Sequence, residues 1–265
     1  MRKIKITAVS YLNTKPLLYG LLNSPLADQV DLSLDIPSEC ARKLRDGEVD
    51  LALTPVAVLP ELTNWNLVSN YCIGAVGEVK TVNIYSEVPI AEITALYLDH
   101  HSRSSVALSR ILLRDHWQIN PALLPAKEGY IDQVKGRTAG VVIGDRTIGL
   151  EHRFPYVYDL SVAWQSLTGL PFVFAAWVST KSLPAEFTVA FNEAMKAGIA
   201  AIPKLKLLLP SPDPSFDLET YFTSYISYHL DEAKREALHK FLGLVAELEP
   251  LPPKNSQQAL SLNLP

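Results

Sequence analysis

The chain has 265 residues, of which 48% are hydrophobic and 20% are charged, a balance typical of folded globular proteins. This composition excludes disordered, collagen-like and disulfide-rich chains. The net charge of −4 is spread without a basic cluster and predicts no nucleic-acid partner. We also predict no membrane span and no signal peptide, and therefore a cytoplasmic protein.

The N-terminal part of the chain alternates apolar strands with helical patterns. Strands are predicted over residues 3–9, 30–36 and 49–53. Helices are predicted over residues 17–22, from Pro37 to near Gly47, and after Pro55. The order predicts a parallel βαβαβ unit, in which the loops after the strands lie where open α/β sheets place their ligands.

The middle of the chain predicts a second α/β unit. Further strands are predicted between Gly77 and Pro89 and over residues 95–98, 140–143 and 172–179, and a helix is predicted over residues 106–112. The remainder to about Leu248 predicts helices, with a loop over residues 209–215 and a poorly ordered tail. No internal repeat is present.

Two α/β lobes joined by two extended crossings predict a hinged cleft, the architecture of periplasmic binding proteins. We expect each lobe to be a mixed sheet flanked by helices, with the ligand between the lobes. Lobe 1 is predicted over residues 1–88 and 178–265, lobe 2 over residues 89–177, and the crossings near 82–89 and 173–180.

The loop of residues 10–16 is the first candidate binding segment. Asn13 offers two donors and an acceptor, Lys15 offers a charge, and Ser10 and Tyr11 precede them. The alternative is that Asn13 or Thr14 merely caps the following helix.

Ser102, Arg103, Ser104 and Ser105 form the second candidate segment, at a predicted helix start. Hydroxyls and free backbone N–H groups there favour an anion, and Arg103 can pair with a carboxylate. The alternative is an ordinary helix cap with a solvated arginine. These features favour a bound carboxylate.

Three further positions are candidates. Asp145 follows a strand and is either an acid–base group, a ligand acceptor or a helix cap. Thr168 and Gly169 lie in an aromatic segment whose main role is core packing, although they are placed near the cleft. His100 and His101 lack further ligands at metal-binding spacing, and Cys40 and Cys72 are two inert thiols, so no metal site is predicted.

Several segments together resemble one family, the chorismate dehydratases of the futalosine route to menaquinone. They are Val-Ser-Tyr-Leu-Asn-Thr-Lys-Pro-Leu at 9–17, Gly-Glu-Val-Lys-Thr-Val at 77–82, Ser-Arg-Ser-Ser at 102–105, Ile-Gly-Asp at 143–145 and Leu-Thr-Gly-Leu-Pro-Phe-Val-Phe-Ala-Ala-Trp at 167–177. The resemblance is strong over residues 4–178, and each motif alone would be weak.

The resemblance implies a binding-protein type II fold and loss of water from chorismate, giving 3-[(1-carboxyvinyl)oxy]benzoate, without a metal or organic cofactor. It links Asn13 and Thr81 to catalysis. Thr81 stands where the family usually has serine, so the hydroxyl is kept while the added methyl group restricts the side chain. Chorismate is the only partner implied, and no oligomeric state is predicted.

Asn13 and Thr81 are neutral at pH 7, so we hypothesise that the substrate's own enolpyruvyl carboxylate removes the proton, with Asp145 as the rival base. Three other functions compete with the dehydratase. They are a sister dihydroxynaphthoate synthase with a similar fold, a non-catalytic small-anion-binding protein, and an intracellular sensor. The Ser-Arg-Ser-Ser segment favours the dehydratase over the sister enzyme, and no helix-turn-helix extension supports a sensor.

Overall fold

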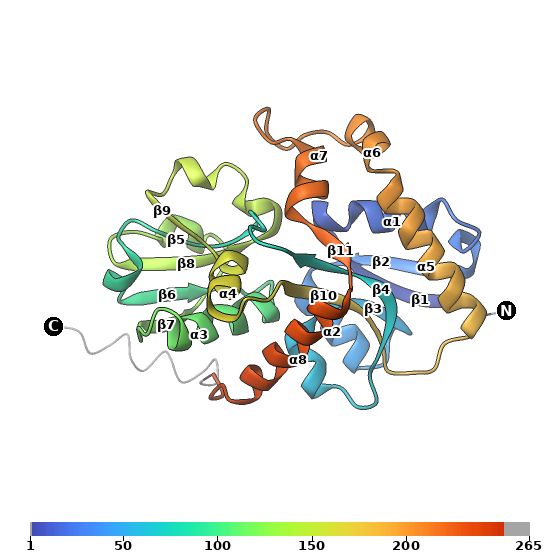
Figure 1. The fold of residues 1–265 in the computed structure, drawn as a ribbon, viewed down its shortest axis with the longest axis horizontal. Coiled ribbons are helices and arrows are strands. Elements are labelled where there is room, and N and C mark those ends of the chain that lie inside the picture. Colours follow the sequence, from blue (N-terminus) through green and yellow to red (C-terminus); the bar gives the residue numbers. More distant parts are fainter. Residues whose placement is uncertain (1, 252–265) are drawn as a thin grey trace.

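The computed structural model describes residues 2–251, which form two β-sheets flanked by helices and placed side by side (Figure 1). The tail predicted after Leu248 lies, from residue 252 onward, outside the described residues. None of the helices within residues 2–251 is long and apolar enough to span a bilayer.

The first sheet has six strands in the order β11-β4-β10-β3-β1-β2. These strands are β1 Ile4–Val9, β2 Val30–Asp35, β3 Leu51–Pro55, β4 Asn66–Ala75, β10 Phe172–Ser179 and β11 Ser227–His229. Helices α1 (Lys15–Leu22) and α2 (Pro37–Arg45) connect β1, β2 and β3, which pair in parallel. The predicted βαβαβ unit is therefore confirmed.

The second sheet has five strands in the order β7-β6-β8-β5-β9. They are β5 Val82–Ser86, β6 Ala95–Leu98, β7 Ala122–Pro125, β8 Thr138–Ile143 and β9 Tyr156–Asp159. Strand β6 runs parallel to β7 and β8, whereas β5 runs antiparallel to β8 and β9, so the sheet is mixed. Helices α3 (Arg103–Asp115) and α4 (Leu160–Thr168) belong to this part of the chain.

The strand predicted between Gly77 and Pro89 is present only in part, as β5. Strand β4 ends at Ala75, and β5 begins only at Val82 in the other sheet. Between them Gly77 and Lys80 adopt positive φ angles of 81° and 67°, which extended strands do not allow. The alternation of apolar residues does not reveal this break.

The C-terminal part is mainly helical, as predicted, with α5 Ala185–Ala200, α6 Ile202–Leu208, α7 Leu218–Thr220, a π-helix Tyr221–Tyr225 and α8 Glu232–Ala246. The 3-10 helices of the chain are Leu12–Thr14, Ala27–Gln29, Val56–Glu61, Ile90–Glu92, Tyr130–Gln133, Gly144–Thr147 and Leu150–His152. Helix α5 packs closely on α1, because a Cβ added at Gly20 would lie 1.9 Å from the Ala194 carbonyl oxygen. The short strand β11 was not predicted.

Pairing of the strands places the two crossings between the sheets at residues 76–81 and 169–171. Both precede the segments expected to cross, 82–89 and 173–180. The expected segments do not cross because they are already strands of one sheet. Strand β5 pairs with β8 and β9 in the second sheet, and β10 pairs with β3 and β4 in the first.

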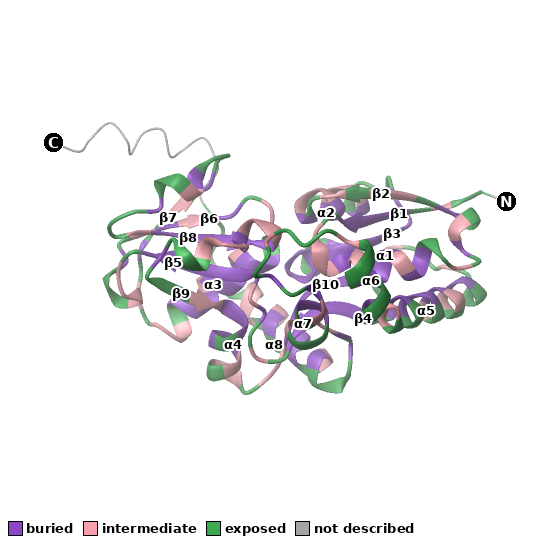
Figure 2. Cartoon of the chain, turned by 90° about the horizontal axis from the view of Figure 1, so that it is seen from above, coloured by how far each residue is buried: buried purple, intermediate pink, exposed green. Residues whose placement is uncertain are grey.

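Aromatic side chains pack where the two lobes meet. Trp164 of α4 lies 5.4 Å from Phe172 of β10 and 6.0 Å from Phe241 of α8, measured between ring centroids. All three are buried and belong to one hydrophobic cluster that extends through both sheets (Figure 2). The predicted core role of this aromatic segment is confirmed, and the lobes share apolar packing at their joint.

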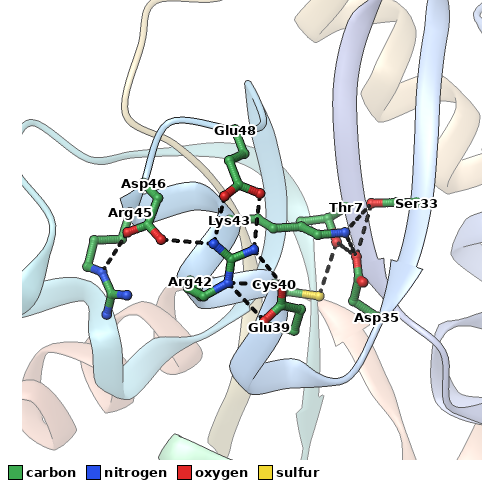
Figure 3. Close-up of polar contacts among 10 residues, drawn as sticks. All are labelled: Thr7, Ser33, Asp35, Glu39, Cys40, Arg42, Lys43, Arg45, Asp46 and Glu48. Carbon is green, nitrogen blue, oxygen red and sulfur yellow. Dashed lines mark hydrogen bonds and ion pairs between the residues drawn. The ribbon is translucent and has the colours of Figure 1, made fainter.

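Helix α2 carries a dense group of ion pairs on its solvent side, shown in Figure 3. The Arg42 guanidinium contacts Glu39 at 2.6 Å, Asp46 at 2.9 Å and Glu48 at 2.6 Å. We call these four residues the α2 cluster. Between a third and a half of each of the four side chains remains exposed, so water competes for every contact.

Next to this cluster, Asp35 at the end of β2 accepts three hydrogen bonds at one carboxylate oxygen. The donors are Thr7 at 2.6 Å, Ser33 at 3.0 Å and Lys43 at 2.6 Å (Figure 3). Only 16% of the Asp35 side chain is exposed, so this group is far better shielded than the α2 cluster. It fixes the end of β2 against β1 and α2.

Candidate functional site

A cavity lies between the two lobes. Strand ends and helix starts of both lobes supply its walls, as expected for a ligand site in an α/β protein. Its lining residues are Val9, Tyr11, Asn13, Pro37, Pro55, Ile73, Val79, Thr81, Val82, Ser102, Ser105, Ile143, Gly144, Phe174 and Ala175. Five predicted site residues therefore meet here, from three segments far apart in the sequence.

The loop after β1 brings Tyr11 and Asn13 to the cavity. The Tyr11 ring lies against Gly144 of the second lobe, where an added Cβ would be 2.9 Å from ring atoms, so only glycine admits this contact. The Tyr11 hydroxyl lies 2.6 Å from Nδ1 of His101. Ser10 is exposed and does not line the cavity.

Burial lowers the pKa of His101, and burial raises the pKa of Tyr11 to about 12. At neutral pH the imidazole is therefore uncharged and the phenol is protonated, so the tautomer of His101 decides which of the two groups donates. This bond joins the loop after β1 to the second lobe.

Thr81 is the last residue of the crossing before β5, and 1% of it is exposed. Its carbonyl accepts from Gly144 N–H at 2.8 Å, and its Oγ1 lies 2.9 Å from the hydroxyl of Tyr221. The crossing is held by Asp159, whose Oδ2 accepts from the backbone N–H groups of Val79 at 2.9 Å and Lys80 at 2.8 Å. A partly buried carboxylate thus fixes the backbone that presents Thr81.

The start of α3 divides the predicted Ser-Arg-Ser-Ser segment. Ser102 is the N-cap, accepting from Ser105 N–H at 3.1 Å, and both serines line the cavity. Ser104 faces the first lobe and accepts from Ala57 N–H at 3.2 Å. Arg103 pairs with Glu61 beside a separate surface groove, with half of its side chain exposed.

The first turn of α3 therefore brings Ser102 and Ser105 to the cavity wall, where the Ser102 hydroxyl donates to Ser105 Oγ at 3.0 Å. The positive end of the helix dipole favours an anion at this position. The structure separates Arg103 and Ser104 from that wall.

Asp145 lies beside the cavity without lining it. Both carboxylate oxygens accept from the N–H of Leu12, at 3.0 and 3.1 Å, so Asp145 caps the loop after β1 across the gap between lobes. Burial raises its pKa above the usual value. Its position fits a contact that holds the lobes together.

Thr168 and Gly169 form the C-terminal end of α4. The Thr168 hydroxyl donates to the Trp164 carbonyl at 2.8 Å, and Gly169 takes the left-handed conformation with φ of 75°. Neither residue lines the cavity.

The residues that line the cavity within the described chain carry no charged side chain. The nearest ion pair behind the wall joins Arg146 to the buried Asp99 at 2.5 Å. The same Asp99 oxygen accepts from the Ile143 N–H at 3.1 Å, so the pair is tied into the second sheet. Within residues 2–251, no group of three or more His, Cys, Asp or Glu side chains is arranged to hold a metal ion.

Sequence reasoning missed Tyr221 and Tyr228, which approach the site from the C-terminal segment. Tyr228 donates to the Asn13 carbonyl at 2.9 Å, and Tyr221 contacts Thr81. Both are buried tyrosines about 140 to 215 residues away from their partners in the chain. No local motif marks them, and only the fold brings them to the cavity.

Comparisons with known proteins agree with this architecture. A family model described as menaquinone biosynthesis matches residues 4–247. A protein of Thermus thermophilus named chorismate dehydratase is 27% identical over 231 residues, which cover 78% of this chain and 83% of the relative.

Solved structures with similar folds share little sequence identity with the chain. An Archaeoglobus fulgidus protein aligns with a TM-score of 0.71 at 15% identity, covering 92% of this chain and 97% of the other. A Candida albicans protein described as having the generic periplasmic binding protein fold aligns with a TM-score of 0.60 at 12% identity, covering 95% and 92%. The expected fold class, two mixed sheets in a periplasmic-binding-protein-like arrangement, is confirmed.

Proposed function

The chain belongs to the menaquinone biosynthesis family, and on that premise we propose that it is a lyase that dehydrates chorismate to 3-[(1-carboxyvinyl)oxy]benzoate. The observation that carries this proposal is the meeting of Asn13 and Thr81 on the wall of one cavity between the lobes. The similarity to a protein named chorismate dehydratase supports it.

The cavity suits a small ligand with two carboxylates. It lies among strand ends and helix starts of both lobes, where α/β proteins bind small molecules. One carboxylate would lie at the first turn of α3, where Ser105 accepts from Ser102 and keeps its own hydroxyl proton for the ligand, and where the helix dipole is favourable. The other lies with the enolpyruvyl group beside Asn13 and Thr81.

A substrate carboxylate is the best candidate for the base. The lining residues of the described chain include no carboxylate, histidine or lysine, and the Asp145 oxygens are engaged by Leu12 N–H. An enolpyruvyl carboxylate folded over the ring would reach the proton on the carbon that bears the ether oxygen. Asn13 and Thr81 would hold it there and hydrogen-bond the leaving hydroxyl.

The bond changes balance without an added reactant. The C–H bond at the ether-bearing carbon breaks, its proton moves to the carboxylate, and its electron pair forms a ring double bond. The neighbouring C–O bond breaks, and the departing hydroxide takes the proton from the carboxylate and leaves as water. The product ring is aromatic, which supplies the driving force, so the protein chiefly orients the substrate.

The test is incubation of the purified protein with chorismate, without added metal or nucleotide, followed by mass and ultraviolet absorbance. Loss of one water with a benzoate spectrum is the expected result. Chorismate recovered unchanged from a bound complex would favour a small-anion-binding protein. If the protein neither binds nor converts chorismate, then chorismate is not its ligand, and the sister dihydroxynaphthoate synthase activity is the next one to test.

A further inference from the structure

Tyr221 lies directly behind the cavity wall and has only its hydroxyl as a polar side-chain group. It is 1% exposed and does not itself line the cavity. Its ring packs against Phe216 and Phe222, with centroids 5.1 and 5.6 Å away. The aromatic packing therefore fixes where the hydroxyl is held.

A π-helical turn places this side chain. The N–H of Ile226 donates to the Tyr221 carbonyl at 3.1 Å, a bond that spans five residues and widens the helix. Such turns are rare and occur frequently at functional sites. Strand β11 follows at once, and its Tyr228 holds the Asn13 backbone, so this segment reaches Asn13 through two tyrosines.

One hydrogen bond near Tyr221, between Thr14 and Asn13, has a definite direction. Thr14 Oγ1 donates to Asn13 Oδ1 at 3.2 Å, which leaves the amide NH₂ of Asn13 to donate elsewhere. Thr81 Oγ1 lies 2.9 Å from the Tyr221 hydroxyl, and either group can be the donor of that hydrogen bond. Hydrogen bonding with the side chains of Thr81 and Asn13 lowers the pKa of Tyr221, against the larger effect of burial.

Tyr221 has a single proton to donate. Burial raises the pKa of Tyr221 well above its usual value, so the phenol keeps that proton at neutral pH. If its oxygen accepts from Asn13, its proton is directed to Thr81 Oγ1. The proton of Thr81 is then free to point into the cavity that Thr81 lines.

We propose that Tyr221 is a positioning residue that accepts a hydrogen bond from Asn13 and donates one to Thr81, so that Thr81 presents its proton to the leaving hydroxyl of chorismate. Thr14, Asn13, Tyr221 and Thr81 form the hydroxyl–amide chain. This inference rests on the proposed dehydratase function. It adds a side chain from the C-terminal segment to a site otherwise built from the first 175 residues.

Replacement of Tyr221 by phenylalanine keeps the ring packing and removes only the hydroxyl. For Tyr221→Phe we expect kcat to fall about tenfold, the effect of one lost neutral hydrogen bond in the transition state. KM should change less than about twofold, because Tyr221 does not touch the substrate. Tyr225→Phe, in the same π-helical turn, is the matched control and should keep the wild-type kcat.

The double variant separates positioning from general loss of structure. In a Thr81→Val background the Tyr221→Phe change should cause no further fall in kcat, since the acceptor of its bond is already gone. A full additional fall would show that Tyr221 acts without Thr81 and would overturn the proposal. Circular dichroism and thermal unfolding establish that each variant is folded.

Two outcomes distinguish this inference from the proposed function. If the wild-type protein does not convert chorismate, the proposed dehydratase function and the proposed role of Tyr221 are both contradicted. If the wild type converts chorismate while Tyr221→Phe keeps or raises kcat, only the inference falls, because Thr81 would then donate to Tyr221. Should Tyr221→Phe fail to fold, Thr14→Val tests the chain from its other end: a lower kcat at constant KM supports it, and an unchanged kcat overturns it.

Discussion

The α2 cluster and the hydroxyl–amide chain are each built from four polar side chains, yet they differ in charge and in burial. The α2 cluster consists of full charges that are one third to one half exposed. The hydroxyl–amide chain is neutral, and its two hydroxyl ends, Thr14 and Thr81, are buried. Water and salt weaken the first group, whereas the low dielectric of the interior strengthens the second.

The comparison teaches that density of charge is a poor guide to function in this protein. The most heavily charged cluster lies on the outer side of α2, and the cavity wall is made of hydroxyl, amide and apolar groups. We therefore expect the loss of one buried hydrogen bond at the site to change the activation free energy more than the loss of the exposed ion pairs changes the free energy of unfolding.

The largest effect is expected at the amide of the hydroxyl–amide chain. Asn13→Ala should reduce transition-state stabilisation by about 2–4 kcal/mol, because it removes a preorganised donor and the partner of Tyr221. Substrate affinity should fall less. Steady-state kinetics and chorismate titration measure the two quantities, with Asn23→Ala at the exposed end of α1 as control. An equal loss in binding would limit Asn13 to holding the substrate.

An intermediate effect, on stability, is expected at Asp35, the shielded group beside the α2 cluster. Burial opposes ionisation, but hydrogen bonds from Lys43, Thr7 and Ser33 lower the pKa of Asp35 below its usual value. Asp35→Asn should therefore cost about 1–3 kcal/mol of unfolding free energy at pH 7. Since the folded pKa is the lower one, this contribution is complete above the unfolded pKa of about 4 and disappears as the pH falls through the folded pKa.

Urea unfolding at pH 7 and pH 3 measures this difference. The difference in unfolding free energy between the wild type and Asp35→Asn should narrow at pH 3, while Asp31→Asn, at an exposed position earlier in the same strand, should behave as wild type at both. A gap of the same size at both pH values would contradict the assigned role of the Asp35 carboxylate.

A smaller effect is expected at Asp145. Asp145→Asn keeps an oxygen for the Leu12 N–H and leaves the cavity wall unchanged, so turnover should fall less than about tenfold, well short of the 10²–10⁴ expected for loss of a general base. Turnover and chorismate binding are measured on the same preparation. Abolished turnover with intact binding would make Asp145 the base and end the substrate-assisted mechanism.

The smallest effect is expected in the α2 cluster itself. Arg42→Gln removes three ion pairs, but all are exposed, so the urea midpoint should move less than in Asp35→Asn. The remaining shift should shrink further at high salt, because salt screens exposed charges. A shift in the urea midpoint of Arg42→Gln that is independent of salt and as large as that of Asp35→Asn would show that the α2 cluster is not weakened by water and salt.

Much of the fold was predictable from local patterns. The βαβαβ unit, the strands at residues 95–98 and 172–179, and the helix start at Ser102 all follow from apolar periodicity and capping residues. The late start of β5 at Val82 was not predictable, because Lys80 takes a positive φ that is uncommon for a lysine. Strand β9 is short and partly exposed, and only its pairing with β5 makes it a strand.

The candidate site was predictable as a set of loops but not as a geometry. Asn13, Thr81, Ser102 and Ser105 meet at the cavity, while Arg103 points to Glu61 on the surface. Adjacent residues on a helix point in different directions, so a motif of four cannot place all its side chains in one site. Tyr221 lies 140 residues from Thr81, and no sequence signal links them.

The position of β10 between β3 and β4 has a consequence for how the chain folds during synthesis. The second sheet is made from one continuous stretch, residues 82–159, and needs no later segment for its strand pairing. The first sheet stays split until residues 172–179 leave the ribosome and join its halves. We therefore expect the inserted lobe to become protease-resistant first in nascent chains, and the cavity to be completed last, when Tyr221 docks.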